Sequence, residues 1–211
     1  MIIIAAYGVL FVMGARGRPA DGDTMRLRYA ACAEALPIVQ GRVDAMGLGD
    51  PHFETKPDGF ELTTRLPVEV ERAARIPIAL AQTGDLQVLD AETGDVLVDR
   101  SHVTGSLVRL DIVANPSTIV FLDQPAANAI ADFRKAAPLG AIAVTIDGDR
   151  VWTHKNEHPL DPTRLDVLTT KTTLHEGTAQ VAEWVVLLDA PALPCPVQLV
   201  SSETVEVTEV P

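Results

Sequence analysis

The order of strand-like and helix-like segments predicts an α+β protein of two ferredoxin-like (split βαβ) subdomains, a base and a head, with mixed or antiparallel sheets. Three observations support this class. Residues 25–89 follow the order strand, helix, strand, strand, helix, strand, which is that of a split βαβ unit. A second run of strand, helix and hairpin covers residues 117–153. A helix, a proline-rich stop and an extended run then close the chain over residues 178–207.

The first half of the chain supplies the elements of the first unit. Leu27 and Tyr29 alternate with arginines, as residues of a half-buried strand do. Val39, Val43 and Met46 share one helical face, and the glycines after them end that helix. We expect strands at 25–31, near 52–55, at 60–66 and at 86–89, a turn at 57–59, and helices at 36–46 and at about 69–80, the latter interrupted by Pro77.

The middle of the chain is less regular. Residues 91–111 are polar, with short strands expected at 96–98 and 107–112. A clear strand at 117–122 leads into a helix that Asp123 caps. Asp147-Gly148 separates two extended runs and predicts a hairpin turn.

The last stretch begins with a helix. Val181, Val185 and Leu188 recur at i, i+4 and i+7 and predict its apolar face. Pro191 and the prolines that follow it cannot continue a helix. The strand expected after them contains the polar pair Ser201-Ser202, which we interpret as a bend.

The composition limits the possible functions. With 211 residues, of which 47% are hydrophobic, the chain is long enough for one large or two small cores. Its formal net charge of −12 disfavours phosphate backbones and therefore nucleic-acid binding. Acidity by itself favours solubility and names no partner.

An uncharged, mostly apolar segment begins the chain at residues 1–15, and Arg16 and Arg18 follow it. The segment is shorter than the ~20 residues that a membrane-spanning helix needs. It also lacks the basic start and the cleavage site of a signal peptide. Three interpretations remain open: a clipped membrane helix, an atypical signal sequence, or a buried strand at residues 2–4. We favour membrane targeting and treat residues 1–18 as a separate N-terminal segment.

Cys32 and Cys195 lie far apart in the sequence, and neither belongs to a C-x-x-C spacing. Two interpretations remain open. We favour two buried small apolar side chains. The alternative is one long-range disulfide, which a periplasm would permit.

No residue is assigned a catalytic, cofactor-binding or metal-binding role. His154 and His158 have an i, i+4 spacing, but Lys155 stands where a helical zinc motif has its glutamate, and Pro159 disfavours a helix. Asp147-Gly148-Asp149 lacks the later ligands of a calcium loop. We expect a solvated loop at the first of these places and a turn at the second.

The remaining polar residues give no enzyme signature. Ser101 and His102 are merely adjacent in sequence, and Glu183 and Asp189 lie on or beyond one helix without a partner for acid–base chemistry. The sequence has no nucleophile elbow, P-loop or dinucleotide fingerprint. Structural roles are expected for the core aromatics Trp152, Trp184 and Phe121, for the capping box of Thr173 and Glu176, and for the isolated His52, His102 and His175 at the surface or at caps.

Several stretches are similar, in order, to segments of one family. Residues 42–51, RVDAMGLGDP, resemble a segment that reads Arg-Val-Asp/Asn-Ala-Leu-Gly-Val before an acidic residue and a proline. Residues 65–67, Arg-Leu-Pro, resemble the family's Leu-Pro-Gly, with Val68 replacing the glycine. Further similar stretches are residues 120–123, VFLD, residues 141–148, AIAVTIDG, and the helix–Ala-Leu-Pro-x-Pro–strand of residues 178–207. Together they resemble the first periplasmic domain of SecD, the protein-export membrane subunit, over residues 25–207.

The resemblance has gaps. The family's Leu-Asp-Leu-x-Gly-Gly signature is not visible in residues 15–27, a polar segment at 154–166 replaces glycines after the hairpin, and Pro191 stands where the family has glycine. The sequence also has no apolar run of 18 or more residues that would correspond to the membrane helices of SecD. We therefore expect none of the proton-driven machinery of those helices here.

The resemblance implies a base subdomain of residues 24–89 with 197–211, and a head of residues 90–196. It implies a SecD-like module on the periplasmic side of the inner membrane that assists protein export without catalysis or a cofactor. Its partners would be translocating or unfolded polypeptide, the Sec translocon and, through the N-terminal segment, the membrane, but no nucleic acid. It would be either a fragment of a larger subunit or, as the second hypothesis, a diverged stand-alone adaptor of the cell envelope that binds another protein. An enzyme or metal-binding protein ranks last.

Overall fold

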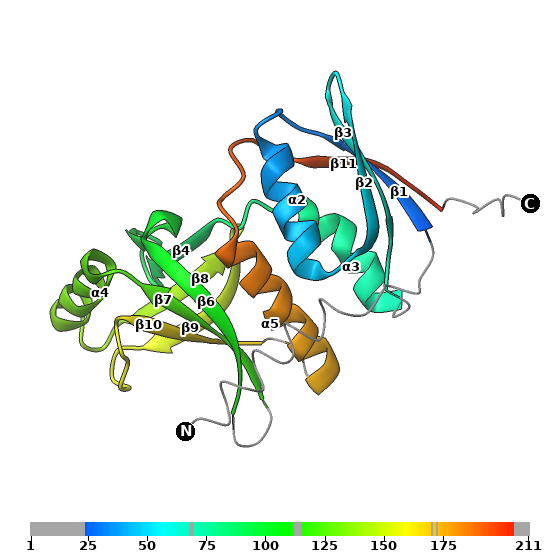
Figure 1. Cartoon of the computed structure of the whole chain (residues 1–211). Helices are drawn as coiled ribbons and strands as arrows, with labels where there is room; N and C mark the ends of the chain where they lie inside the picture. The colour runs from blue at the N-terminus through cyan, green and yellow to red at the C-terminus, as the bar shows by residue number, and fades with distance from the viewer. Residues whose placement is uncertain (1–23, 68–69, 112–114, 170, 172, 205–211) are drawn as a thin grey trace, which may run out of the picture. The chain divides into compact units, whose positions relative to one another are not determined.

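A computed structural model describes residues 24–67, 70–111, 115–169, 171 and 173–204 (Figure 1). The interpretations of residues 1–18 and the strand positions Val205 and Val207 lie outside these ranges. The chain divides into two compact units, Met1–Thr83 with Leu193–Pro211, and Gly84–Ala192. Helices and antiparallel sheets occur in both units, which confirms the α+β class. No helix in the described ranges is long and apolar enough to cross a membrane.

The first unit has one four-stranded antiparallel sheet in the order β11-β1-β3-β2. Its elements are β1 (Thr24–Ala30), α2 (Ala35–Met46), β2 (Gly49–Lys56), β3 (Gly59–Arg65), α3 (Val70–Ala81) and β11 (Gln198–Thr204). These elements give the strand and helix order of a split βαβ motif. The second unit is inserted in the chain between the last helix of this motif and its last strand.

The sequence pattern assigns the sixth element of this motif to residues 86–89, and that assignment is wrong. The corresponding strand, β4 (Leu86–Asp90), pairs in the second unit with β8 (Ala141–Ile146), from Leu86 opposite Ile146 to Asp90 opposite Ile142. An alternating pattern shows that a strand is half-buried but does not identify the sheet that it joins. The first part of the base accordingly ends at Thr83 rather than at residue 89, and the head ends at Ala192 rather than at residue 196.

The core of the first unit follows the predicted periodicities. Leu27 and Tyr29 of β1 and Phe60 and Leu62 of β3 are buried on one face of the sheet, with Val39 among the buried residues of α2. The rings of Tyr29 and Phe60 lie 5.2 Å apart. Burial raises the pKa of Tyr29 far above its ordinary value, so its hydroxyl remains a hydrogen-bond donor.

The helix α3 is continuous through Pro77, where the sequence predicts an interruption. A proline removes one amide donor from a helix, and this loss disfavours it at an interior position. Two features offset that cost. Ile76, Ala79 and Leu80 are buried, and the Tyr29 hydroxyl donates a hydrogen bond of 3.0 Å to the carbonyl of Pro77. Tertiary packing therefore overrides the local signal.

A disulfide joins Cys32, just after β1, to Cys195, just before β11. The favoured interpretation of two separate apolar side chains is therefore wrong. The bond ties the last strand of the first unit to its first strand, across a sequence separation of 163 residues.

The fully buried Arg42 of α2 holds the chain at the end of the same unit's second helix. It donates hydrogen bonds to the carbonyls of Gln82 and Thr83. The carbonyl of Thr83 also accepts a hydrogen bond from the amide of Leu193. The two points where the chain leaves and re-enters the first unit are thus bonded to each other.

The strand β11 continues through Ser201 and Ser202, where a bend is predicted. The pairing with β1 instead shifts register once, because Arg28 faces Ser201 whereas Tyr29 faces Leu199. The irregularity is therefore a bulge at Val200, within an otherwise regular strand.

The second unit has two antiparallel sheets, in the orders β10-β7-β6 and β5-β4-β8-β9. Besides β4 and β8, its elements are β5 (Val96–Val98), a short 3-10 helix η1 (Arg100–His102), β6 (Val103–Leu110), β7 (Pro116–Leu122), α4 (Gln124–Ala136), β9 (Asp149–Lys155), β10 (Arg164–Leu168) and α5 (Leu174–Asp189). The strand β6 begins earlier than the expected residue 107.

The local signals of the second unit are confirmed where they depend on caps and turns. The carboxylate of Asp123 accepts the amide of Ala126 at 2.9 Å and starts α4. The hydroxyl of Thr173 accepts the amide of Glu176 at 3.2 Å and starts α5. Asp147 and Gly148 have φ of 53° and 85°, as a two-residue hairpin between β8 and β9 requires.

The buried face of α5 differs in part from the predicted one. Val181 and Leu188 are buried as expected, but Val185 is only half-buried, and Trp184 and Leu187 complete the face. Val181, Trp184 and Leu188 belong to a core cluster that also contains residues of β7, β8 and β10. The C-terminal end of α5 is thereby fixed beside β6.

Candidate functional site

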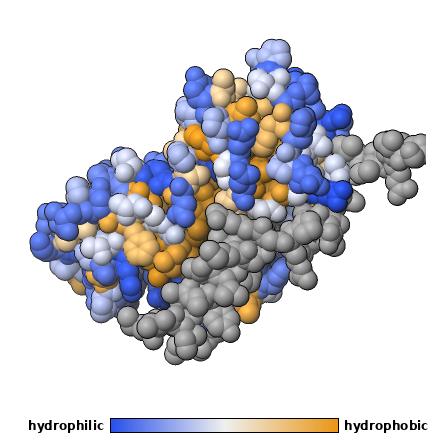
Figure 2. Space-filling model, viewed as in Figure 1, coloured by the Kyte–Doolittle hydropathy of each residue, from blue (hydrophilic) through white to orange (hydrophobic). Residues whose placement is uncertain are grey.

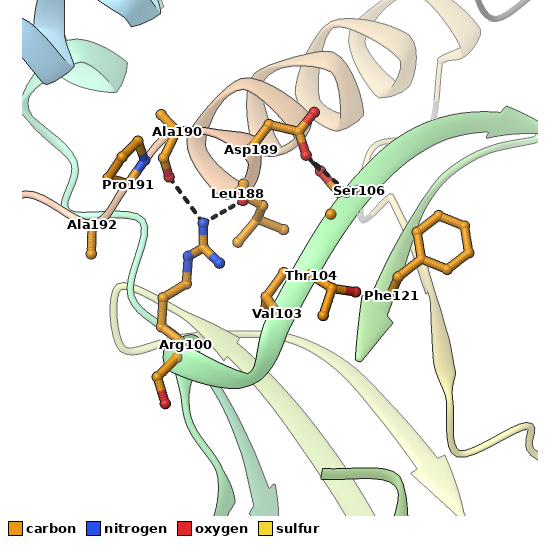
Figure 3. Close-up of a pocket in the computed structure, with 12 residues that line it drawn as sticks. Arg100, Val103, Thr104, Ser106, Phe121, Leu188, Asp189, Ala190, Pro191 and Ala192 are labelled. Atoms are coloured by element: carbon orange, nitrogen blue, oxygen red, sulfur yellow. Dashed lines mark hydrogen bonds between the residues drawn. The ribbon is translucent and has the colours of Figure 1, made fainter. Parts of the chain in front are cut away.

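An open pocket of about 950 Å³ lies in the second unit, between the start of β6 and the C-terminal end of α5 (Figure 3). Residues of η1 and β6 form one wall, Phe121 of β7 contributes a ring, and the chain from Leu188 to Ala192 forms the opposite wall. Apolar and polar residues lie together on the visible surface of the second unit (Figure 2). The pocket brings residues 100–106 and Phe121 together with residues 188–192, which follow much later in the sequence.

Arg100 caps the end of α5. Its guanidinium donates hydrogen bonds to the carbonyl of Leu188 and, at 3.0 Å, to that of Ala190 (Figure 3). The last carbonyls of a helix lack partners within the helix and carry partial negative charge, so a cation stabilises them. Burial lowers the pKa of Arg100 and Asp189 opposes the shift, yet an arginine stays charged at physiological pH. Its Nε is buried without a hydrogen-bond partner among the described residues.

Asp189, the last residue of α5, bonds to the neighbouring strand. Its Oδ1 accepts the backbone amide and the hydroxyl of Ser106, each at 2.8 Å. The strand β6 is at the edge of its sheet in the order β10-β7-β6. The sequence identifies no partner for Asp189, and the structure assigns it a serine and an edge amide rather than an acid–base partner.

The pocket also exposes apolar surface. Phe121, which the sequence places in the core, is half-buried and lines the pocket. Val103, Ala190 and Pro191 add to this surface. Phe121 lies in a strand whose other residues are buried, so its pattern in the sequence is that of a core residue. An open pocket beside a strand edge, lined by apolar side chains and a few polar groups, can hold a molecule that carries both kinds of group.

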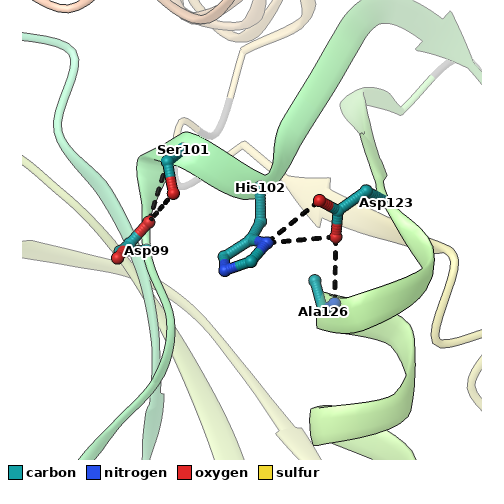
Figure 4. Close-up of polar contacts among 5 residues, drawn as sticks. All are labelled: Asp99, Ser101, His102, Asp123 and Ala126. Atoms are coloured by element: carbon teal, nitrogen blue, oxygen red, sulfur yellow. Dashed lines mark hydrogen bonds and ion pairs between the residues drawn. The ribbon is translucent and has the colours of Figure 1, made fainter.

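A second polar cluster lies next to the pocket (Figure 4). His102 Nδ1 is 3.0 Å from Asp123 Oδ2, and Asp123 also caps α4. Hydrogen bonding to Asp123 raises the pKa of His102, and the Ala126 amide holds the pKa of Asp123 below its ordinary value. His102 is therefore not isolated, as the sequence suggests, but links η1 to the start of α4.

This cluster does not form a nucleophile–base pair. The Ser101 hydroxyl donates to Asp99 Oδ1 at 2.5 Å, and this hydrogen bond lowers the pKa of Asp99. The imidazole of His102 is directed at Asp123 instead (Figure 4). The hydrogen bonds among these residues therefore fix the turn between β5 and β6 and the start of α4.

Of the two histidines with an i, i+4 spacing, His154 lies in β9 and His158 in the bend after it, so the loop expected over both begins only after that strand. His154 stacks on Trp152 of β9 with 5.2 Å between ring centroids, and its Nε2 is 3.3 Å from the carbonyl of His158. The described part of the chain contains no group of three or more His, Cys, Asp or Glu residues that could hold a metal ion. Asp147 of the hairpin turn accepts the amides of Gly84 and Asp85, at 3.3 and 2.8 Å, which is a structural role.

No protein-family model and no curated protein matches the sequence. Solved structures match its fold. A SecDF structure in the super-membrane-facing form aligns with a TM-score of 0.66 and 12% identity over 95% of this chain, which spans only 34% of that SecDF chain. A structure of the membrane component SecDF that enhances protein export aligns with a TM-score of 0.62 and 12% identity, over 85% of this chain and 100% of that one. The chain therefore has a SecDF fold, as its resemblance to SecD implies.

Proposed function

We propose that this chain is a SecD-like module that assists protein export by binding translocating polypeptide, without catalysis of its own. The observation that carries the proposal is the SecDF fold, which is shared over 95% of the chain. One of the matched structures is described as a membrane component that enhances protein export. The pocket between β6 and α5 is the proposed place of binding.

The chemistry of the pocket supports a polypeptide as the ligand. A translocating chain is unfolded and presents apolar side chains together with unpaired backbone amides and carbonyls. The pocket offers the ring of Phe121 and the side chain of Val103 for the former. The strand β6 and the guanidinium of Arg100 lie beside them and supply polar groups. An open shape admits a continuous chain without requiring a free end.

The disulfide supports a periplasmic location. A bond between Cys32 and Cys195 persists in an oxidising compartment and is rare in the cytosol. The proposal therefore places the described units on the periplasmic side of the inner membrane. The Sec translocon is the proposed neighbour, and the N-terminal segment the proposed attachment to the membrane.

Titration with a permanently unfolded protein, such as a reduced and carboxymethylated one, tests the proposal. Isothermal titration calorimetry is expected to give micromolar affinity for the wild type. Phe121→Gln is expected to weaken binding about tenfold or more, because it removes most of one aromatic contact. Leu139→Gln is the matched control, since this side chain is 91% exposed and lies outside the pocket. No detectable binding by the wild type would overturn the proposal.

Cell fractionation combined with intact mass separates the proposed role from that of a stand-alone adaptor. A membrane-bound species much larger than 22.6 kDa is expected for a SecD-type subunit. A free species of 22.6 kDa would instead support the adaptor. The measurement is made on the native protein in the cells that produce it.

A further inference from the structure

The hydrogen bond from the Ser106 amide to Asp189 has the direction of a hydrogen bond to a neighbouring strand. In the pairing of β6 with β7, Ser106 faces Val120 and Leu107 faces Ile119. Backbone groups of successive residues point to opposite sides of a strand. The Ser106 amide donates to Asp189 rather than to β7, so it points to the open side of the sheet.

The carboxylate of Asp189 occupies the place of a partner carbonyl. Its Oδ1 lies 2.8 Å from the Ser106 nitrogen, within the range of a sheet hydrogen bond. Exposed strand edges pair readily with other chains, and proteins protect them with charged side chains. Asp189 reaches this edge from α5, a separate element.

The space along this edge suits an extended chain. A Cβ built on Gly105 would meet nothing within 4 Å, so the face of the strand toward which this Cβ would point is open there. Leu107 and Leu110 of the same strand are 40% and 44% exposed, although leucines of strands are usually covered. The apolar part of the pocket begins at Val103, at the start of the same strand. An occupant that covers all three features must be elongated and carry both backbone acceptors and apolar side chains.

We infer that β6 binds an extended polypeptide segment by strand addition, and that a carbonyl of the segment replaces the Asp189 carboxylate on the Ser106 amide. The inference rests on the proposed function and specifies how the polypeptide is held. Backbone pairing accepts many sequences, because every residue carries an amide and a carbonyl. Asp189 then acts as a competitor that keeps the edge closed until a segment displaces it.

Peptides with methylated amides test the pairing. The probe is a soluble ten-residue peptide in which Val and Thr alternate. Methylation of alternate central amides leaves one edge of the peptide able to pair, and we expect this peptide to bind like the unmodified one. Methylation of adjacent central amides blocks both edges, and we expect affinity to fall at least tenfold. Equal binding of all three peptides would overturn strand addition while leaving the proposed function standing.

Variants of the competitor provide an independent test. Asp189→Ala removes the acceptor on the Ser106 amide, and we expect the unmodified peptide to bind about tenfold more tightly. Asp189→Asn retains an oxygen acceptor that is uncharged and therefore weaker, and we expect it to raise the affinity less than Asp189→Ala does. Unchanged affinity in Asp189→Ala would overturn the displacement. Thermal unfolding of each variant verifies that its fold is intact. The test with methylated peptides uses the wild-type protein and therefore does not depend on the folding of any variant.

A second copy of the chain is the competing occupant of this edge. Sedimentation velocity of the wild type and of Asp189→Ala, without peptide, is expected to show monomers. If the wild type is instead a dimer and Ser106→Pro is a monomer, the edge pairs with another copy of the chain, and this outcome would overturn the inference. Failure of both the unmodified peptide and the unfolded protein to bind would overturn the proposed function together with it.

Discussion

Removal of the Cys32–Cys195 disulfide is expected to destabilise the first unit and leave the second unit unchanged. Both cysteines belong to the first unit, and the whole second unit lies in the loop that the bond closes. The double replacement Cys32→Ser with Cys195→Ser avoids a free reactive thiol. Reduction of the wild-type protein gives the same state without a substitution and serves as the control.

The size of the effect follows from the length of the closed loop. For a separation of 163 residues the chain-entropy relation gives about 5 kcal/mol if the entire chain unfolds. If the second unit stays folded, it bridges most of the loop, and only roughly a third of the residues become flexible. The same relation then gives about 4 kcal/mol. For a unit of this size, such a loss lowers the melting temperature by roughly 15 °C or more.

The distribution of tryptophans allows each unit to be followed separately. Both tryptophans of the chain, Trp152 and Trp184, lie in the second unit. Urea unfolding followed by tryptophan fluorescence therefore reports on that unit, whereas far-UV circular dichroism reports on both. The double variant is expected to shift one phase of the dichroism curve to lower urea and to leave the fluorescence midpoint in place.

Two outcomes would refute this reasoning. A fluorescence midpoint that shifts as much as the dichroism midpoint would show that the units unfold together, in contradiction to the two-unit division. A dichroism shift smaller than about 1 kcal/mol would show that closure of the loop contributes little to stability.

Three further predictions concern single side chains. Hydrogen bonding to the carboxylate that caps α4 raises the pKa of His102 above 6.5, so this pair stabilises the fold below that pH and is lost as the pH rises through the raised pKa. The urea midpoints of wild type and His102→Gln should therefore differ more at about pH 5.5 than at about pH 8.5, and equal differences would contradict the pairing. Gly177→Ala is expected to lower the free energy of unfolding by about 1–3 kcal/mol, because its Cβ would lie 2.7 Å from a side-chain carbon of Pro116. Gly41→Ala, with nothing within 4 Å of the new Cβ, should raise it by up to ~1 kcal/mol in the same urea assay. Arg42→Ala removes a buried donor from the carbonyls of Gln82 and Thr83, of which the second keeps the amide of Leu193. The change should cost the first unit about 2–5 kcal/mol by far-UV circular dichroism, and a loss below ~1 kcal/mol would contradict the prediction.

Local signals predict most of the elements, because each depends on a few neighbouring residues. Asp123 caps α4 through an amide three residues away, and Asp147-Gly148 turns the chain within two residues. The wrong assignments depend on distant partners. The pattern of Leu86–Asp90 is the same in either sheet, and only its pairing with β8 places it in the second unit. Likewise, Pro77 is a helix breaker in sequence and becomes acceptable once Tyr29 packs against it.

The pocket is harder to predict than the fold, because its walls come from segments separated by more than 80 residues. Arg100 has no feature in the sequence that indicates a bond to Leu188, at a separation of 88 residues. Phe121 follows five buried positions of β7 and has the pattern of one more core residue. The disulfide is equally hard to predict, because two cysteines without a characteristic spacing are compatible with both a disulfide and two free thiols.

The polar groups around the pocket hold its walls in place. Here the Ser101 hydroxyl is bonded to Asp99, the His102 imidazole to the cap of α4, and the Asp189 carboxylate to Ser106. These bonds hold η1, α4, α5 and β6 in place. Apolar side chains and a strand edge line the pocket beside them, and the proposed binding of a polypeptide depends on these groups.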